Sequence, residues 1–298
     1  MTADLLVPYH RHMADDRHRE LAKALLTWSL QLCSCNRGSA WHAREAFYAA
    51  TFERYCAPPD AAERENLLCA KYITFFFSLD DGLHNELEAL ADQLRSGRPV
   101  RAGELGTLHD ALLADLRAHG LDTKQVEARI AELCAAAVTE RARDARTMTQ
   151  EQFHDLRMVT VAAKPYIDCR RAVRNLPVPN EENLVEQALE AIYIANDLAS
   201  LDKETASGGA GEYETSNIVR FHAACSGRDL NAVITTVTDR YNHIAATLRN
   251  TTPGPLATIL TSTVDGNLRA HVGLSTTRYP GAARLLRCLQ PVVPPSRR

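Results

Sequence analysis

The stretch LEAIYIANDLASLDKE, residues 189–204, is the most informative part of this sequence for both fold and chemistry. Apolar residues dominate its first half, and their spacing predicts an α-helix. On that helix Asn196, Ser200 and Glu204 recur at every fourth residue and share one face. An amide oxygen, a hydroxyl and a carboxylate are hard donors, which Mg²⁺ prefers. The stretch therefore predicts a magnesium site, with Lys203 near enough to meet a phosphate group.

A plainer interpretation of the same stretch is a solvated helix end, in which Asp202, Lys203 and Glu204 face water before a glycine-rich loop. For isolated charges that interpretation is the better one. Against it, Asn196 and Ser200 are poor residues for a helix interior, because their side chains compete with the backbone for hydrogen bonds. Both follow an apolar run directly, so we expect them to face a pocket.

Helical periodicity extends over the rest of the chain, where good helix formers are abundant and alternating strand patterns are hardly visible. Glycines and prolines divide the sequence into segments. We expect helices over residues 16–35, 41–57, 61–80, 82–96, 103–119, 123–146, 150–175, 180–205, 216–250 with a break near Gly227, and 255–274. Without a visible linker or repeat, residues 1–298 are expected to form one all-α domain, a bundle or a barrel, with a flexible tail at 291–298.

The composition of the 298 residues, 45% of them hydrophobic, is that of a globular protein with a substantial core. A net charge of −3 and a pI near 6.4 give no general attraction to nucleic acid, so any phosphate binding must be local. Eight scattered cysteines without a CxxC pair indicate buried thiols in a reducing compartment. We see no signal peptide and no membrane-spanning run, and expect a soluble cytoplasmic protein with neither nucleic acid nor membrane as partner.

A second acidic element follows the aromatic run Phe75–Phe77. Asp80 and Asp81 end an apolar segment, where adjacent carboxylates repel each other and a divalent cation would relieve the repulsion. Two metal-binding helices could thus face each other. The alternative is that both aspartates simply end a buried helix at Gly82, and for this element alone that alternative is the stronger one.

Together the two elements resemble those of class I terpene synthases, in particular the bacterial terpene cyclases. The hallmark of that family is an aspartate-rich helix followed far downstream by an Asn-Asp-x-x-Ser-x-x-x-Glu helix. The downstream motif is complete here at Asn196, Asp197, Ser200 and Glu204.

The upstream motif departs from the common pattern of the family. Asp80 and Asp81 match it, but the third acidic position falls on His84 or Asn85, with Glu86 as the nearest carboxylate. The resemblance gives Asp80 the main role in binding magnesium.

Two further landmarks occur in the family's order. Arg278 and Tyr279, which begin 82 residues after Asn196, match the C-terminal Arg-Tyr pair that closes over the diphosphate. Arg157, in the stretch LRMVT at residues 156–160, is similar to the arginine that senses the diphosphate. Each could singly be an ordinary surface or tail residue, but together they extend the resemblance over most of the chain.

The resemblance implies a class I terpenoid synthase fold with a central active-site cavity, and a lyase that ionises an acyclic isoprenoid diphosphate and cyclises the carbocation to a terpene hydrocarbon or alcohol. It implies three Mg²⁺ ions once diphosphate is bound. Their predicted ligands are Asp80, Asp81, Glu86, Asn196, Ser200 and Glu204. The side chains predicted to act in ionisation are Asp80, Arg157, Lys203, Arg278 and Tyr279. A homodimer is compatible with the resemblance, although no segment marks an interface.

The carbocation needs a dry pocket whose aromatic faces stabilise positive charge. Phe76 and Phe77 are the best candidates for its wall, and Tyr166 is a weaker one. Val161 and Val272 stand where larger side chains are common in the family, which predicts a larger cavity. We therefore favour the C20 substrate geranylgeranyl diphosphate slightly over the C15 farnesyl diphosphate.

Two other functions remain open at this point. A chain-elongating isoprenyl diphosphate synthase shares the fold and the magnesium chemistry, but it typically needs two aspartate-rich motifs, and here the downstream helix carries Asn196 and Ser200. A non-catalytic helical scaffold needs only amphipathic helices, and it leaves the spacing from Asn196 to Glu204 unexplained.

Overall fold

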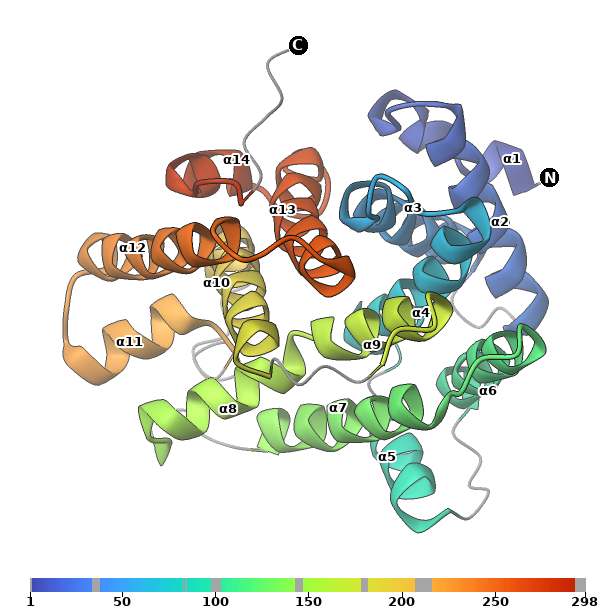
Figure 1. The fold of residues 1–298 in the computed structure, drawn as a ribbon, viewed down its shortest axis with the longest axis horizontal. Helices are drawn as coiled ribbons and strands as arrows, with labels where there is room; N and C mark the ends of the chain where they lie inside the picture. The colour runs from blue at the N-terminus through green and yellow to red at the C-terminus, as the bar shows by residue number, and fades with distance from the viewer. Residues whose placement is uncertain are drawn as a thin grey trace. The chain divides into compact units, whose positions relative to one another are not determined.

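The computed structural model describes residues 2–33, 38–81, 83, 85–97, 103–142, 147–177, 182–206 and 216–292 (Figure 1). Within these ranges the regular structure is helical and contains no β-strand, which confirms the all-α prediction. The glycine-rich loop after Ala206 and the end of the C-terminal tail lie outside the described residues. No described helix is long and apolar enough to cross a lipid bilayer.

The chain forms two compact units, Met1–Val138 with Pro165–Pro177, and Thr139–Lys164 with Val178–Arg298. The single domain predicted from the sequence stays a prediction. The first unit contains α1 (Thr2–Leu5), η1 (Val7–His12), α2 (Asp16–Leu32), α3 (Ser39–Cys56), α4 (Glu63–Asp81), α5 (Leu87–Ser96), α6 (Gly103–Ala118), and most of α7 (Lys124–Ala142) and α9 (Ala163–Val173). The second contains α8 (Gln150–Thr160), α10 (Glu182–Ala206), α11 (Ile218–Ser226), α12 (Leu230–Arg249), α13 (Pro255–Gly273), α14 (Ala282–Leu285) and η3 (Leu286–Cys288).

In the first unit α3 packs against both α2 and α4, and α4 also packs against α6. The core of these contacts is aromatic and aliphatic, with Phe47, Phe75 and Leu25 fully buried. Burying such side chains contributes on the order of 2 kcal/mol each. The packing holds the C-terminal half of α4, which carries Phe75–Phe77 and ends at Asp81.

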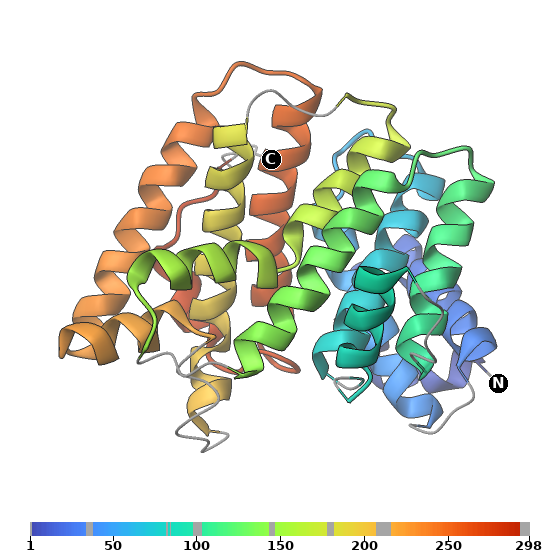
Figure 2. The same ribbon diagram turned by 90° about the horizontal axis from the view of Figure 1, so that it is seen from below.

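In the second unit α10 lies between α12 and α13, as Figures 1 and 2 show. Its apolar residues are buried on nearly every side, among them Leu189, Ile192, Ile194 and Leu198. A helix that is apolar around most of its circumference is stable only inside a core. A polar residue on this helix is therefore held between packed neighbours.

The structure differs from the sequence prediction at residues 150–175, where one continuous helix was expected. Instead α8 ends at Thr160 and α9 begins at Ala163, with Ala162 in the left-handed region at φ 59°. Pro165 lies in the first turn of α9, where the missing N–H has no intrahelical partner to lose. The same proline inside a continuous helix would break it, so Pro165 is the signal that the prediction passed over.

Candidate functional site

The motif on α10 lies in a regular helix, as predicted, and its three oxygen donors share one face. Asn196 and Glu204 are partly exposed, whereas Ser200 is buried at 5% exposure. The Ser200 hydroxyl donates to the carbonyl of Asp197 at 3.4 Å. This single weak bond leaves the lone pairs of the hydroxyl oxygen without a donor among the described residues.

The amide of Asn196 contacts a histidine on α13. Asn196 Nδ2 lies 3.3 Å from Nε2 of His271, and Nδ1 of His271 lies 2.7 Å from the carbonyl oxygen of Asn267. His271 is fully buried, and burial lowers its pKa to about 4. The ring is therefore neutral near pH 7, and no described residue donates to Oδ1 of Asn196.

The carboxylate of Glu204 is held by a residue from the next helix. Asn217, which is fully buried, donates from Nδ2 to Glu204 Oε2 at 2.7 Å and to the carbonyl of Asp197 at 2.8 Å. Its own Oδ1 caps α11 by accepting from the backbone N–H of Val219. The cap of α11 thus fixes one oxygen of Glu204, and Oε1 accepts no hydrogen bond from a described residue.

Asp197 points away from the donor face and is fully buried. Its Oδ1 accepts from Arg157, and its Oδ2 accepts from the backbone N–H of Ile218 at 2.7 Å. Burial raises the pKa of Asp197 to about 7, and the guanidinium of Arg157 opposes that shift. Asp197 therefore joins α8, α10 and α11, and its carboxylate has no lone oxygen to give to a metal.

Arg157, the predicted diphosphate sensor, is 5% exposed. Besides Asp197, it contacts Glu140 at 3.3 Å and donates to the hydroxyl of Thr160 at 2.9 Å. The arginine is thereby attached to the backbone segment that carries the metal motif. Lys203 is partly exposed on the same segment.

Arg278 and Tyr279 follow α13 and are both buried. Arg278 Nε donates to the hydroxyl of Tyr279 at 2.9 Å, and its guanidinium lies over the tyrosine ring, 5.3 Å from the centroid. The ring of Tyr279 also lies against His271, with 4.5 Å between the centroids. His271 therefore contacts both the Arg-Tyr pair and Asn196.

The upstream motif belongs to the first unit. Asp80 is exposed and Asp81 partly exposed in the last turn of α4. Phe76 is partly exposed, whereas Phe77 is buried and lies against the rings of Tyr48 and Phe52, with centroids 6.1 and 5.4 Å away. The side chain of Phe77 is thus part of an aromatic cluster at the same end of the helix.

The carboxylate of Glu86 has a structural partner. Its Oε2 accepts from the backbone N–H of Leu105 at 2.8 Å, in the first turn of α6. Gly103 gives it room, because a Cβ there would lie 2.4 Å from Cδ of Glu86. A carboxylate at a helix N-terminus satisfies an unpaired donor and the helix dipole, so this bond competes with the predicted metal role.

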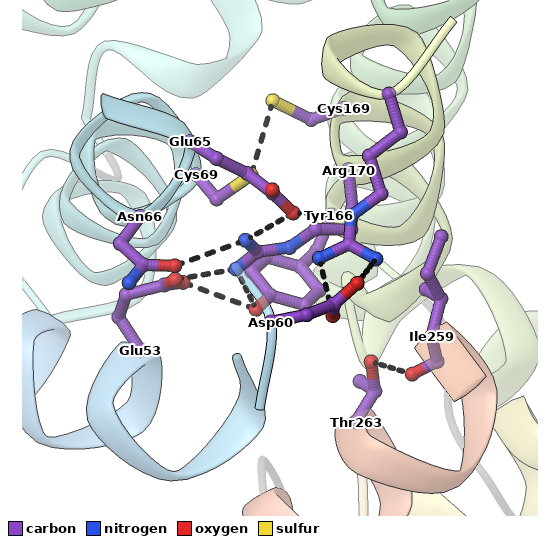
Figure 3. A network of polar contacts seen from close by, with 11 residues as sticks. Glu53, Asp60, Glu65, Asn66, Cys69, Tyr166, Cys169, Arg170, Ile259 and Thr263 are labelled. Atoms are coloured by element: carbon purple, nitrogen blue, oxygen red, sulfur yellow. Dashed lines mark hydrogen bonds and ion pairs between the residues drawn. The ribbon is translucent and has the colours of Figure 1, made fainter. Parts of the chain in front are cut away.

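Tyr166, a predicted pocket residue, is part of a buried polar network in the first unit (Figure 3). Its hydroxyl donates to Glu53 at 3.0 Å and accepts from Arg170 at 2.8 Å. Arg170 also pairs with Glu53 and, at 2.8 Å, with Glu65. Nothing in the sequence indicated this network, whose bonds join residues 105 to 117 positions apart except for the pair on α9.

The two valines predicted to enlarge the pocket differ in burial. Val161 is 9% exposed at the end of α8, and Val272 is 42% exposed on α13. Only Val161 is enclosed by neighbours. Of the two valines, only Val161 is buried enough for a position in a pocket wall.

The donor set of α10 fits a hard cation by its chemistry. Among the described residues no group of three His, Cys, Asp or Glu side chains converges. An amide, a hydroxyl and one carboxylate suit Mg²⁺, which keeps water or phosphate oxygens in its shell. Nδ2 of Asn196 is held by His271, and Oε2 of Glu204 is held by Asn217. Hydrogen bonds of this kind orient the ligands of metal sites in proteins.

A known family model matches more than half of the chain. The model described as terpene synthase family 2, C-terminal metal binding, matches residues 71–245. This range contains both acidic motifs and Arg157, while Arg278 and Tyr279 lie beyond it. No curated protein sequence matches the chain.

Solved structures of similar fold cover most of the chain. The 2-methylisoborneol synthase from Streptomyces coelicolor A3(2) matches with a TM-score of 0.66 and 16% identity, over 90% of this chain and 93% of the synthase. The linalool/nerolidol synthase from Streptomyces clavuligerus matches with a TM-score of 0.64 and 18% identity, over 84% and 96%. At this level of identity they show a shared fold.

Proposed function

The chain belongs to terpene synthase family 2, and we propose that it ionises an acyclic isoprenoid diphosphate with Mg²⁺, cyclises the carbocation to a terpene hydrocarbon or alcohol, and releases diphosphate. The observation that carries this proposal is the α10 face, where Asn196, Ser200 and Glu204 each keep an oxygen without a donor. Hydrogen bonds from neighbouring helices anchor the first and the last of them.

The residues of α10 would hold magnesium ions, which we propose number three with diphosphate bound. When bound, these ions supply the positive charge that stabilises the departing diphosphate. Asn196, Ser200 and Glu204 contribute only one formal negative charge, so the metal keeps a strong attraction for phosphate oxygens. Asp197 keeps the helix in place from the opposite face.

We propose that Asp80 on α4 binds the same group of ions, with Asp81 beside it. This part rests on the order of the two motifs in the family and on the exposure of Asp80 at the end of its helix. Glu86 is the weakest member of the proposed ligand set, because its carboxylate already accepts from Leu105.

Four side chains would contact the phosphate oxygens themselves. Arginine presents a planar fork that matches two oxygens of a phosphate, and tyrosine adds a neutral donor. Arg157, Lys203, Arg278 and Tyr279 are therefore the proposed contacts. Arg278 Nε donates to the Tyr279 hydroxyl, so the two side chains would meet the diphosphate together.

The hydrocarbon part of the substrate needs a dry wall. We propose Phe76 and Phe77 as the aromatic part of this wall, and Val161 as a small residue that leaves room for a long chain. On this basis the C20 substrate remains the one we favour over the C15 substrate. Val272 and Tyr166 support the proposal less, since one is exposed and the other is bound in a polar network.

The test of the function is turnover of purified protein with Mg²⁺ and the C15 or C20 diphosphate, with gas chromatography of the extract. We expect a terpene product, and removal of Mg²⁺ by chelation should abolish it. Asn196→Ala should reduce product formation by at least about 100-fold, because a metal ligand is lost. Asn183→Ala, at an exposed position on the same helix, is the matched control and should leave turnover unchanged.

Three outcomes would change the proposal. Turnover of Asn196→Ala at the level of the control would remove the α10 face from the mechanism. A longer diphosphate formed after addition of isopentenyl diphosphate would identify a chain-elongating enzyme instead. Consumption of the C15 substrate alone would reverse the preference for C20.

A further inference from the structure

We propose that His271 is a positioning residue that turns the amide oxygen of Asn196 toward the metal. The inference rests on the proposed function and adds a residue from α13 that the motifs do not contain. Asn196 and His271 are 75 residues apart in sequence and meet because α10 packs against α13.

The orientation of the His271 ring decides which of its nitrogens can accept. Its Nδ1 lies 2.7 Å from the carbonyl oxygen of Asn267, one turn earlier on α13. A carbonyl oxygen can only accept, so Nδ1 carries the hydrogen. With the hydrogen on Nδ1, Nε2 is the nitrogen that faces the Asn196 amide, and its lone pair accepts.

The acceptor at Nε2 fixes which end of the Asn196 amide faces it. Nδ2 of Asn196 lies 3.3 Å away and can donate to it. The reversed amide would place its carbonyl oxygen against the lone pair of Nε2, which is repulsive. The planar amide therefore directs Oδ1 away from His271, and Oδ1 receives no hydrogen bond from a described residue.

The ring itself has little freedom to turn. His271 is fully buried. Its ring packs against the ring of Tyr279, with 4.5 Å between the two centroids. A buried ring held by a hydrogen bond and an aromatic neighbour is a rigid support for a metal ligand. The same residue thus supports Asn196 and packs on the Arg-Tyr pair.

Two substitutions separate the two hydrogen bonds of the ring. In His271→Gln the amide reaches the position of Nε2, so an acceptor for Asn196 is retained. In His271→Asn the shorter amide reaches only the position of Nδ1, so the bond to Asn267 is retained and the acceptor for Asn196 is lost. His243→Leu, at an exposed histidine of α12, is the control for a histidine without a role in the site.

The measurement is the binding of Mn²⁺, as a spectroscopic probe for Mg²⁺, to the full chain in the presence of inorganic diphosphate, followed by electron paramagnetic resonance. We expect His271→Asn to weaken Mn²⁺ binding by about 10- to 100-fold, the range found when a supporting residue of a metal ligand is lost. His271→Gln should stay within about 3-fold of the wild type, as the control should. In an Asn196→Ala background, His271→Asn should cause no further loss, because the two changes remove one interaction.

The outcomes distinguish this inference from the function on which it rests. If the wild type does not bind Mn²⁺ with diphosphate, the proposed function itself fails. If the wild type binds and both His271 variants bind equally well, or are weakened equally, the positioning role is overturned. Thermal unfolding of each variant accompanies the titration, and a loss of affinity in a variant that unfolds at the wild-type temperature supports the inference.

Discussion

Two buried arginines, one in each unit, pair with buried carboxylates in similar ways but have different roles. Arg170 is fully buried and donates to Glu53, Glu65 and Tyr166 in the first unit (Figure 3). Arg157 is 5% exposed and contacts Asp197 and two other residues in the second unit. Burial raises the pKa of one carboxylate partner of each arginine to about 7, that of Glu53 for Arg170 and that of Asp197 for Arg157.

The difference lies in what the carboxylate partner is attached to. Glu53 lies in the last turn of α3 and Glu65 in the first turn of α4, and the proposed ligands Asp80 and Asp81 lie at the other end of α4. Asp197 stands next to Asn196 and also accepts from the first N–H of α11. A similar buried ion pair therefore supports the core in one unit and the helix of the proposed metal motif in the other.

The largest effect is expected on stability at Arg170. In Arg170→Met, Glu53 and Glu65 lose a buried partner, so the free energy of unfolding should fall by about 3–5 kcal/mol. Urea unfolding at pH 7 measures the change. Arg174 is a less buried arginine that pairs with Glu65 and Asp60. Arg174→Met should lower the free energy of unfolding by about 1 kcal/mol. Equal losses in both variants would show that burial of Arg170 has no special role.

The next largest effect is expected on catalysis, where substitutions of Arg157 and Arg170 should differ in their effect on turnover. Arg157→Lys keeps the charge but loses the planar fork, and we expect turnover to fall by about 100-fold, or about 2.7 kcal/mol in the barrier. Arg170→Lys is the matched change in the other unit, and its folded fraction should retain turnover. Steady-state assays at equal folded concentration make the comparison. Wild-type turnover in Arg157→Lys would place both arginines in the same structural class.

A smaller effect is expected on the pH dependence of stability. Burial raises the pKa of Glu53 to about 7 from the ordinary 4.5, so the folded chain holds this proton more tightly than the unfolded chain. The corresponding stability is present below about pH 4.5 and is lost as the pH rises through about 7. Glu53→Gln should therefore flatten the fall in unfolding free energy across this window. Parallel curves for the variant and the wild type, from urea unfolding at several pH values, would count against the shift.

The smallest effect on stability is expected at the ion pair of Arg240 with Glu190, which has short contacts like those of Arg170 but an exposed arginine. Arg240 contacts Glu190 through two bonds of 2.7 and 2.6 Å, but its side chain is 53% exposed. Arg240→Ala should lower the free energy of unfolding by no more than about 1 kcal/mol, because water screens the pair. Thermal unfolding in low and high salt checks this. A loss as large as that of Arg170→Met would mean that geometry, and not burial, sets the strength of these pairs.

Most helices could be predicted from the sequence because helical periodicity is a local property. The expected segment at 180–205 corresponds to α10 at Glu182–Ala206, and the predicted break near Gly227 separates α11 from α12. The break at Val161 and Ala162 differs from the predicted helix over 150–175, and Pro165, which fits the first turn of a new helix, is the local signal for it. The tail beyond Val292 lies outside the described residues, and its predicted flexibility stays a prediction.

The candidate site could be predicted only along single helices. The shared face of Asn196, Ser200 and Glu204 follows from the spacing of four residues. The partners of these residues do not follow from it. Asn217 follows the glycine-rich loop and His271 lies near the end of α13, and no local pattern marks either of them as a partner of the motif.

The sequence by itself determined the helical class of this protein and the oxygen donors of its proposed metal motif, because both depend on the local geometry of single helices. The tertiary structure alone decided which atoms of those donors are already bound and which arginine is attached to the motif. Hydrogen bonds such as those of Asn196 to His271 and Asp197 to Arg157 join residues 75 and 40 positions apart. Such contacts depend on how whole helices pack, and no local pattern specifies them.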